Sequence, residues 1–211
     1  MDFKQLLLLA PPILVALTFH EFAHAFVAYL YGDDTAKRGG RLTLNPLAHL
    51  DPWGTIMIFI VHFGWAKPVP VNPYNLRNPK QGMLWISAAG PLSNILLALI
   101  SGLLLRFVTF MEIRPIPNSV PEIFIIMLVL SLKINLALAI FNILPIAPLD
   151  GSKILYGILP ARFGKHIHLL ERYGPILLIG LIISSQFLGV SILGRLIWPF
   201  VTFFSELFAG I

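Results

Sequence analysis

The stretch His20-Glu21-Phe22-Ala23-His24 lies inside an apolar run from Leu6 to Tyr31. Residues four apart in a helix share one face, so the two histidines can offer their imidazoles to one metal ion. The glutamate follows the first histidine directly, where its carboxylate can take a proton from a metal-bound water. Ionisable groups in a membrane span are energetically costly and mark a functional site by default. The motif therefore predicts a metal-dependent hydrolytic site inside a membrane-spanning helix.

The composition independently indicates a membrane protein. Of the 211 residues, 57% are hydrophobic and 12% charged, against about 25% charged in an ordinary soluble domain. The same motif arises by coincidence on helices of soluble proteins, but this composition argues against an ordinary soluble domain. The net charge of +5 could suggest nucleic acid; the basic residues are sparse and lie beside apolar spans, so a membrane topology explains them better. No cysteine is present, which excludes thiolate metal ligands.

Four apolar regions are long enough to cross about 30 Å of hydrocarbon. They run approximately over 6–31, 84–108, 122–144 and 175–208, and the last is long enough for two spans broken near Gly189 to Arg195. Pro11 and Pro12 are expected to start or kink the first helix, and Gly32-Asp33-Asp34 to end it.

The stretch 53–65 is too short to cross and is expected to be re-entrant or interfacial. We therefore predict an all-α polytopic membrane protein of about five to six transmembrane helices. A short re-entrant β-hairpin-like loop is expected between the first two core helices. Residues 1–211 are expected to form one domain, with a core over 12–155 and C-terminal helices over 175–208.

The distribution of basic residues predicts the orientation. If 53–65 does not cross, segments 32–82 and 145–174 lie on one side and together carry ten of the fifteen lysines and arginines. Lys4, Arg106 and Arg114 fall at the opposite ends. The positive-inside rule makes the ten-charge face cytoplasmic. The protein is thus expected in the cell membrane, with the site nearer the cytoplasmic side.

A catalytic zinc site needs a third protein ligand, and Asp150 is the candidate. It follows the third long span, on the same predicted side as the end of the first, in irregular backbone between Pro148 and Gly151. The alternative is an ordinary Pro-Asp-Gly turn at a helix end. Other carboxylates fit less well, because they lie beyond the end of the first helix or near the opposite face: Asp33, Asp34, Asp51, Glu112 and Glu122.

The sequence resembles the site-2 protease family of intramembrane zinc metalloproteases, in its compact prokaryotic form without a PDZ or CBS domain. The resemblance covers roughly residues 12–155. It rests on His20 to His24, Ala89 to Asn94 and Asn142 to Gly151, with support from Asn45 to Thr55 and Trp65 to Asn72. It implies that His20, His24 and Asp150 bind one Zn²⁺ per chain, that Glu21 is the catalytic acid/base, and that substrates are single-span membrane proteins.

Several other polar residues lie in or near the spans. Asn94 is expected either to hydrogen-bond a neighbouring helix or to bind the substrate carbonyl; Asn142 is expected to help position substrate. Asn135 is expected to join helices, and Lys133 to face protein or a watery cleft because a lipid-facing charge is costly. His49 and His62 are expected to pack in the loop region rather than to bind metal.

The predicted function is therefore an intramembrane zinc endopeptidase that cleaves peptide bonds within or near transmembrane helices, the lipid bilayer being its surroundings and nucleic acid no partner. Segment 61–72, with alternating valines, could offer a strand edge to an unwound substrate or could form a simple interfacial hairpin. Two alternatives come from other classes. A zinc-handling transporter would usually show repeated halves, which are absent from the sequence. A catalytically silent adaptor would lose a ligand or the base, and here all four residues are present.

Overall fold

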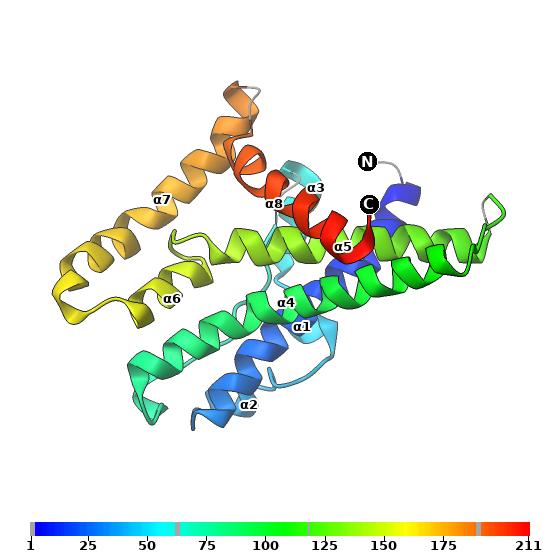
Figure 1. Cartoon of the computed structure of the whole chain (residues 1–211). Coiled ribbons are helices and arrows are strands. Elements are labelled where there is room, and N and C mark those ends of the chain that lie inside the picture. Colours follow the sequence, from blue (N-terminus) through cyan, green and yellow to red (C-terminus); the bar gives the residue numbers. More distant parts are fainter. Residues whose placement is uncertain (1–2, 62–63, 118, 189–190) are drawn as a thin grey trace.

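The computed structural model describes residues 3–61, 64–117, 119–188 and 191–211. Within these ranges the chain is helical and contains no β-strand (Figure 1). His62 lies outside the described residues. The α-helices are α1 (Phe3–Leu30), α2 (Thr35–Arg38), α3 (Pro52–Val61), α4 (Pro79–Phe110), α5 (Val120–Ile143), α6 (Asp150–Ile158), α7 (Gly164–Leu188) and α8 (Ile192–Ala209).

Five helices in the described part of the chain are long and apolar enough to cross a membrane, which confirms the all-α membrane fold. They are the spans Gln5–Leu30, Pro79–Phe110, Val120–Ile143, Gly164–Ser184 and Ile192–Ala209. The region 175–208 thus contributes to two spans, as its length predicted, but the first of them begins earlier than expected, at Gly164. Less than a third of each span is buried against protein, so large apolar side chains remain on the outer surface, where lipid would cover them.

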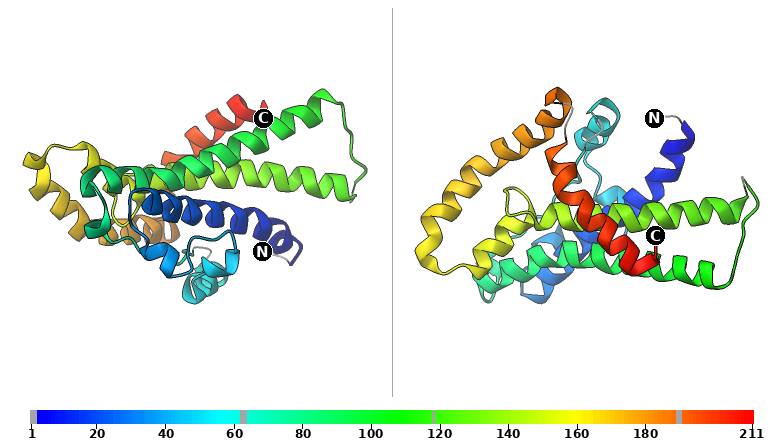
Figure 2. Two further views of the ribbon diagram at one scale, coloured as in Figure 1. Left: turned by 90° about the horizontal axis from the view of Figure 1, so that it is seen from below. Right: turned by 45° about the horizontal axis from the view of Figure 1, so that its top comes forward.

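Helix α4 is the centre of the bundle, since it packs against α1, α5, α6 and α8. A buried apolar cluster joins α4, α5 and α8: Ala98, Leu105, Leu128, Leu132, Leu136, Val201 and Ala209. Small residues on α4 let its neighbours approach closely, as is common between membrane helices. The C-terminal end of α1, the N-terminal end of α4 and the C-terminal end of α5 gather at one end of the molecule (Figures 1 and 2). The segments with ten basic residues begin at that end, as the charge pattern requires.

The expected β-hairpin-like loop is wrong. Residues 52–61 form α3, and the only strand-like pairing in the described ranges is one antiparallel bridge between Leu50 and Ala66. A short apolar run does not by itself distinguish a strand from a helix. Here the preceding residues decide it: the Asp51 carboxylate accepts a hydrogen bond from Gly54 N at 2.8 Å, and Pro52 occupies the first helical position.

The first helix does not begin at its two prolines. Helix α1 starts at Phe3 and contains Pro11 and Pro12 in its first half. The residues before them, Leu6 to Ala10, are good helix formers, and an apolar environment favours closed backbone hydrogen bonds. The helix ends at Leu30, and Gly32 then adopts a φ of 102°, a left-handed conformation that glycine adopts without strain.

Asp33 anchors the loop that follows α3 to the end of α1. Its buried carboxylate accepts hydrogen bonds from Asn72 N at 2.7 Å and from Asn75 Nδ2 at 2.9 Å. It also accepts from the amide and hydroxyl of Thr35. Burial opposes ionisation, but these donors outweigh it and hold the pKa of the Asp33 carboxyl below its usual range. The charged, buried carboxylate of Asp33 therefore fixes one end of the segment between α3 and α4.

Candidate metal centre

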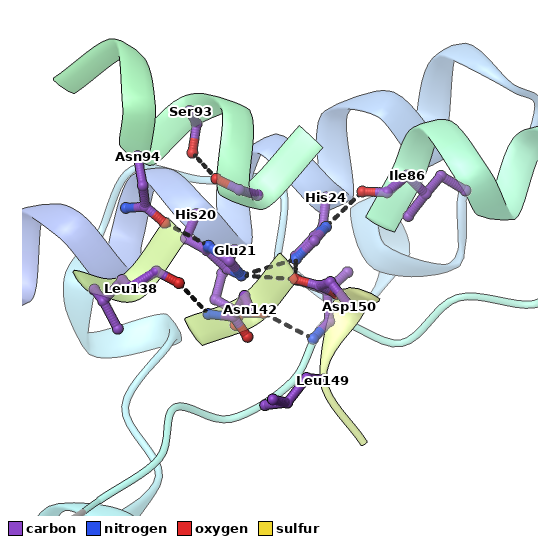
Figure 3. Close-up of polar contacts among 12 residues, drawn as sticks. His20, Glu21, His24, Ile86, Ser93, Asn94, Leu138, Asn142, Leu149 and Asp150 are labelled. Carbon is purple, nitrogen blue, oxygen red and sulfur yellow. Dashed lines mark hydrogen bonds and ion pairs between the residues drawn. The ribbon is translucent and has the colours of Figure 1, made fainter. Parts of the chain in front are cut away.

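Two histidines one turn apart on α1 point their rings to the same place. His20 and His24 are 6% and 8% exposed, and their Nε2 atoms lie 3.0 Å apart (Figure 3). Each ring is fixed through Nδ1. His20 Nδ1 lies 2.7 Å from Asn94 Oδ1, and His24 Nδ1 lies 2.6 Å from the carbonyl oxygen of Ile86. Because oxygen accepts in both contacts, each Nδ1 carries the proton and each Nε2 is free to bind metal.

Asp150 completes a triangle with the two histidines. Its Oδ2 lies 3.2 Å from Nε2 of His20 and 3.2 Å from Nε2 of His24. The residue is the first of α6, so the loop from Leu144 returns the carboxylate to α1. Gly151 makes this return possible: a Cβ there would lie 2.1 Å from the carbonyl oxygen of Ile143. Any larger residue would push α6 away from the end of α5.

The electrostatics favour an anionic carboxylate at this position. Burial disfavours the charged form of Asp150, but a proton carried by the neighbouring His24 or His20 in the metal-free site outweighs it and holds the pKa of the carboxyl below its usual range; a bound metal would take the place of that proton. A carboxyl must be deprotonated to bind metal. Asp150 is therefore in the ionisation state that a ligand needs at neutral pH.

The three ligand atoms fit a zinc ion. Zinc with ligands at about 2.0–2.1 Å in a tetrahedron separates neighbouring ligand atoms by about 3.3 Å; the observed edges are 3.0, 3.2 and 3.2 Å. Asp150 Oδ2 is buried and makes no hydrogen bond of good geometry in the described structure, as a ligand atom would. Gly90 on α4 provides the space, because a Cβ there would lie 2.5–2.6 Å from Nε2 of both histidines.

Glu21 lies at the edge of this triangle and faces a cavity of about 360 Å³. Its Oε2 accepts a hydrogen bond from the backbone N–H of Val69 at 3.1 Å. The cavity has mostly apolar walls, including Trp65, Val71 and Met83. A carboxylate beside a metal triangle and an apolar cavity is the arrangement that a general base for peptide hydrolysis requires.

The two asparagines predicted to bind substrate have different surroundings. Asn142 lines the cavity and donates one amide hydrogen to Leu138 O at 3.0 Å (Figure 3). Asn94 is fully buried and does not line the cavity. Besides accepting from His20, it donates to Ala16 O at 3.1 Å and to Asn135 Oδ1 at 2.9 Å. Its contacts thus favour the first of its expected roles, a link between helices, and also orient a histidine.

A chain of buried polar groups continues from Asn94 away from the metal triangle. Asn135 on α5 donates to Ser131 O at 2.9 Å, and the Ser131 hydroxyl lies 2.9 Å from that of Ser101 on α4. This confirms that Asn135 joins helices. Buried polar groups that are all hydrogen-bonded hold helices at fixed positions in an apolar medium. The orientation of His20 is therefore connected to the packing of α4 on α5.

Other candidates lie outside the site. His49 is 1% exposed and hydrogen-bonds Thr43 O at 2.8 Å, so it packs in the loop region as expected. Lys133 is exposed on α5. The expectation that it faces the protein interior is therefore wrong. Sequence reasoning missed Val69 and Ile86, which act through backbone atoms and leave no signal in the sequence. Gly90 lies within the motif Ala89 to Asn94, but its place beside the two histidines only the structure shows.

Comparison with known proteins identifies relatives that are named as zinc metalloproteases. Residues 116–183 match the model of Peptidase family M50. The protein named "Putative zinc metalloprotease YwhC" of Bacillus subtilis (strain 168) is 41% identical over 190 residues, which cover 89% of this chain and 82% of that protein. "Putative zinc metalloprotease Rip2" of Mycobacterium tuberculosis (strain H37Rv) is 33% identical over 148 residues, 67% of this chain and 53% of its own length. No solved structure matches.

The fold and the relatives define a membrane-embedded zinc metalloprotease. The chain belongs to the site-2 protease family, Peptidase family M50. The matched segment includes Asp150 and Asn142 but not the two histidines, so the roles of individual residues depend on the geometry above.

Proposed function

We propose that His20, His24 and Asp150 bind one Zn²⁺ per chain, and that Glu21 is the general base and acid of an intramembrane endopeptidase. The observation that carries the proposal is the convergence of three ligand atoms within 4.8 Å of one another. They are buried among membrane-spanning helices, and a carboxylate of the same helix turn lies beside them. The single domain over residues 1–211 would contain the whole site.

A zinc ion bound there would supply Lewis acidity, which activates water and polarises the scissile carbonyl. Glu21 accepts the proton of the attacking water and delivers it to the departing amine. Asn94 and the Ile86 carbonyl hold the two imidazoles in the tautomer that leaves Nε2 free. Asn142, in the cavity wall, binds the substrate backbone through its amide oxygen and the N–H that is not donated to Leu138 O. The apolar walls accept the side chains of the substrate.

The substrates are proposed to be single-span membrane proteins. A helix closes its carbonyl groups in hydrogen bonds, so the substrate must unwind locally before a carbonyl can reach the site. The cavity is bounded on one side by the non-helical segment 66–71, beside which an extended backbone can lie. Cleavage should therefore be faster when the substrate span contains helix-destabilising residues.

The site is proposed to face the cytoplasmic side of the cell membrane. The basis is the ten basic residues in segments 32–82 and 145–174. Cysteines introduced at Lys37, Arg77 and Arg162 should react with an impermeant reagent from the cytoplasmic side alone. Labelling of the Arg77 variant from the opposite side would contradict this topology.

The substitution Glu21→Gln tests the function. Gln keeps size and polarity but accepts no proton at neutral pH, so the variant should retain zinc and lose cleavage by roughly 10²–10⁴-fold. The measurement is hydrolysis of a reconstituted single-span substrate, with zinc content determined on the same sample. Glu171→Gln, at an exposed glutamate of α7, is the matched control. Near-normal cleavage by zinc-loaded Glu21→Gln would refute the mechanism.

A further inference from the structure

Glu21 is contacted by the non-helical segment 67–72, which lies between α3 and α4. The backbone N–H of Val69 donates to Glu21 Oε2 at 3.1 Å. Residues 67–72 form no helix or strand, and Pro68 and Pro70 on either side have no N–H to pair with anything. The position of this one donor therefore depends on what holds the segment in place.

A buried arginine holds the segment directly before Val69. Arg41 is 5% exposed. Its guanidinium donates to the carbonyl oxygen of Pro68 at 3.3 Å and to the carbonyl oxygen of Lys67. A planar guanidinium that bonds two successive carbonyls fixes both the position and the direction of the backbone. These are the two peptide units that lead into the Val69 amide.

His49 supports the same grip. Its Nδ1 lies 3.4 Å from the Arg41 guanidinium, and its backbone carbonyl accepts from Lys67 N at 2.9 Å. At the other end of the segment, Asp33 accepts from Asn72 N. The segment is thus held at 67–68 and at 72, and Val69 lies between these fixed points.

Burying the Arg41 guanidinium only to hold Lys67 and Pro68 in place would cost stability. Burying a cation lowers stability unless all its donors are satisfied, and an apolar residue of similar size often serves stability as well. Arg41 Nε has no hydrogen-bond partner in the described structure. The burial of an incompletely paired guanidinium next to the segment that contacts Glu21 indicates a role in function.

We propose that Arg41 is a positioning residue for Glu21, acting through segment 67–69. It holds the Val69 amide against one oxygen of Glu21, so that the other oxygen is directed toward the attacking water. This deepens the proposed function and rests on Glu21 being the general base. His49 and Asp33 keep the segment in place at either side of this contact.

The final link is tested by two substitutions at one position. Val69→Pro and Val69→Ala both replace the valine side chain, but only the first, whose ring is bonded to the backbone nitrogen, removes the N–H. A hydrogen bond to a charged group is typically worth enough to change a rate about tenfold or more. The kcat of Val69→Pro for a reconstituted single-span substrate should therefore be at least about tenfold below that of Val69→Ala, with equal zinc content. Equal kcat values for the two would overturn the proposal.

Arg41→Met tests the grip itself, because methionine fills a similar apolar volume without donors. It should lower kcat by about tenfold or more while KM and zinc content stay near those of the unaltered protein. Amide hydrogen exchange in residues 66–72 should become faster. The control is Arg38→Met, at a cation whose side chain is 79% exposed and pairs with Asp34. Unchanged kcat, or parallel loss of zinc and kcat as in a general packing defect, would overturn the role.

Two outcomes distinguish a failure of the positioning role from a failure of the proposed function. If Glu21→Gln retained activity in the same assay, the mechanism would fail whatever Arg41 did. If Glu21→Gln is inactive but Val69→Pro matches Val69→Ala, the mechanism stands and the positioning role fails. Should Arg41→Met not fold, the ratio between the two Val69 variants still tests the contact with Glu21 through which Arg41 is proposed to act, and equal kcat values would overturn the role.

Discussion

Replacing Gly90 by alanine should remove zinc while leaving the fold intact. The added Cβ would lie 2.5 Å from His24 Nε2 and 2.6 Å from His20 Nε2, whereas ordinary contact begins at 3.4 Å. To reach ordinary contact, the ligand nitrogens of His20 and His24 would have to move by about 0.8 and 0.9 Å. Metal sites tolerate deviations of only about 0.2 Å in ligand distance. We therefore expect zinc affinity to fall by at least about 100-fold, the upper end of what is lost when a residue that only supports a metal ligand is altered.

The assay is zinc content after dialysis against a graded series of competing chelators. Gly180→Ala is the matched control, because a Cβ at that helical glycine meets nothing within 4 Å. Alanine is a better helix former than glycine by about 1 kcal/mol, which offsets part of the cost of about 1–3 kcal/mol for crowding the two rings, so zinc-free Gly90→Ala should remain folded, as thermal unfolding beside Gly180→Ala would show. Zinc binding by Gly90→Ala as tight as that of Gly180→Ala would refute the placement of the metal against α4.

Two further predictions concern groups around the site. Asn94→Leu should weaken zinc binding by roughly 10–100-fold, while Asn94→Asp, which keeps an acceptor for His20 Nδ1, should weaken it less; equal affinities in chelator competition would contradict the orienting role. Asp33→Asn should lower thermal stability at neutral pH. Because the folded pKa of Asp33 is depressed, its stabilisation is complete above the unfolded value of about 3.9 and is lost as pH falls through the lower folded value. The difference in unfolding temperature should therefore shrink below about pH 4, and a constant difference down to pH 2 would be inconsistent with that charge.

The cluster of His20, His24 and Asp150 was predictable because its signals are local and chemical. The spacing of His20 and His24 fixes them on one helix face, and the apolar run around them makes any other reason for their presence costly. Predicting Asp150 required the topology as well. Its place after the third long span is what returns it to the membrane depth of the two histidines. The structure places all three side chains together.

The remaining features depended on tertiary packing or on backbone atoms. The run from Trp53 to Trp65 is apolar throughout, so its periodicity does not separate helix from strand. The signal that indicates a helix is the Asp51 cap before it, which the sequence analysis did not weigh. Asn94 was assigned by its motif to either packing or substrate, and only its three contacts distinguish the two. The donor at Val69 and the acceptor at Ile86 belong to the backbone, which no residue pattern identifies.

The central claim is that His20, His24 and Asp150 together hold one zinc ion. The most direct test is the zinc stoichiometry of purified Asp150→Ala, with X-ray absorption at the zinc edge on the unaltered protein. Asp34→Ala, at an aspartate that pairs with Arg38 on the surface, is the control. We predict one zinc per chain with imidazole and oxygen ligands at about 2.0–2.2 Å in the unaltered protein and in Asp34→Ala. Asp150→Ala should remain inserted but lose zinc on dialysis, and stoichiometric, tightly held zinc in Asp150→Ala would contradict the account.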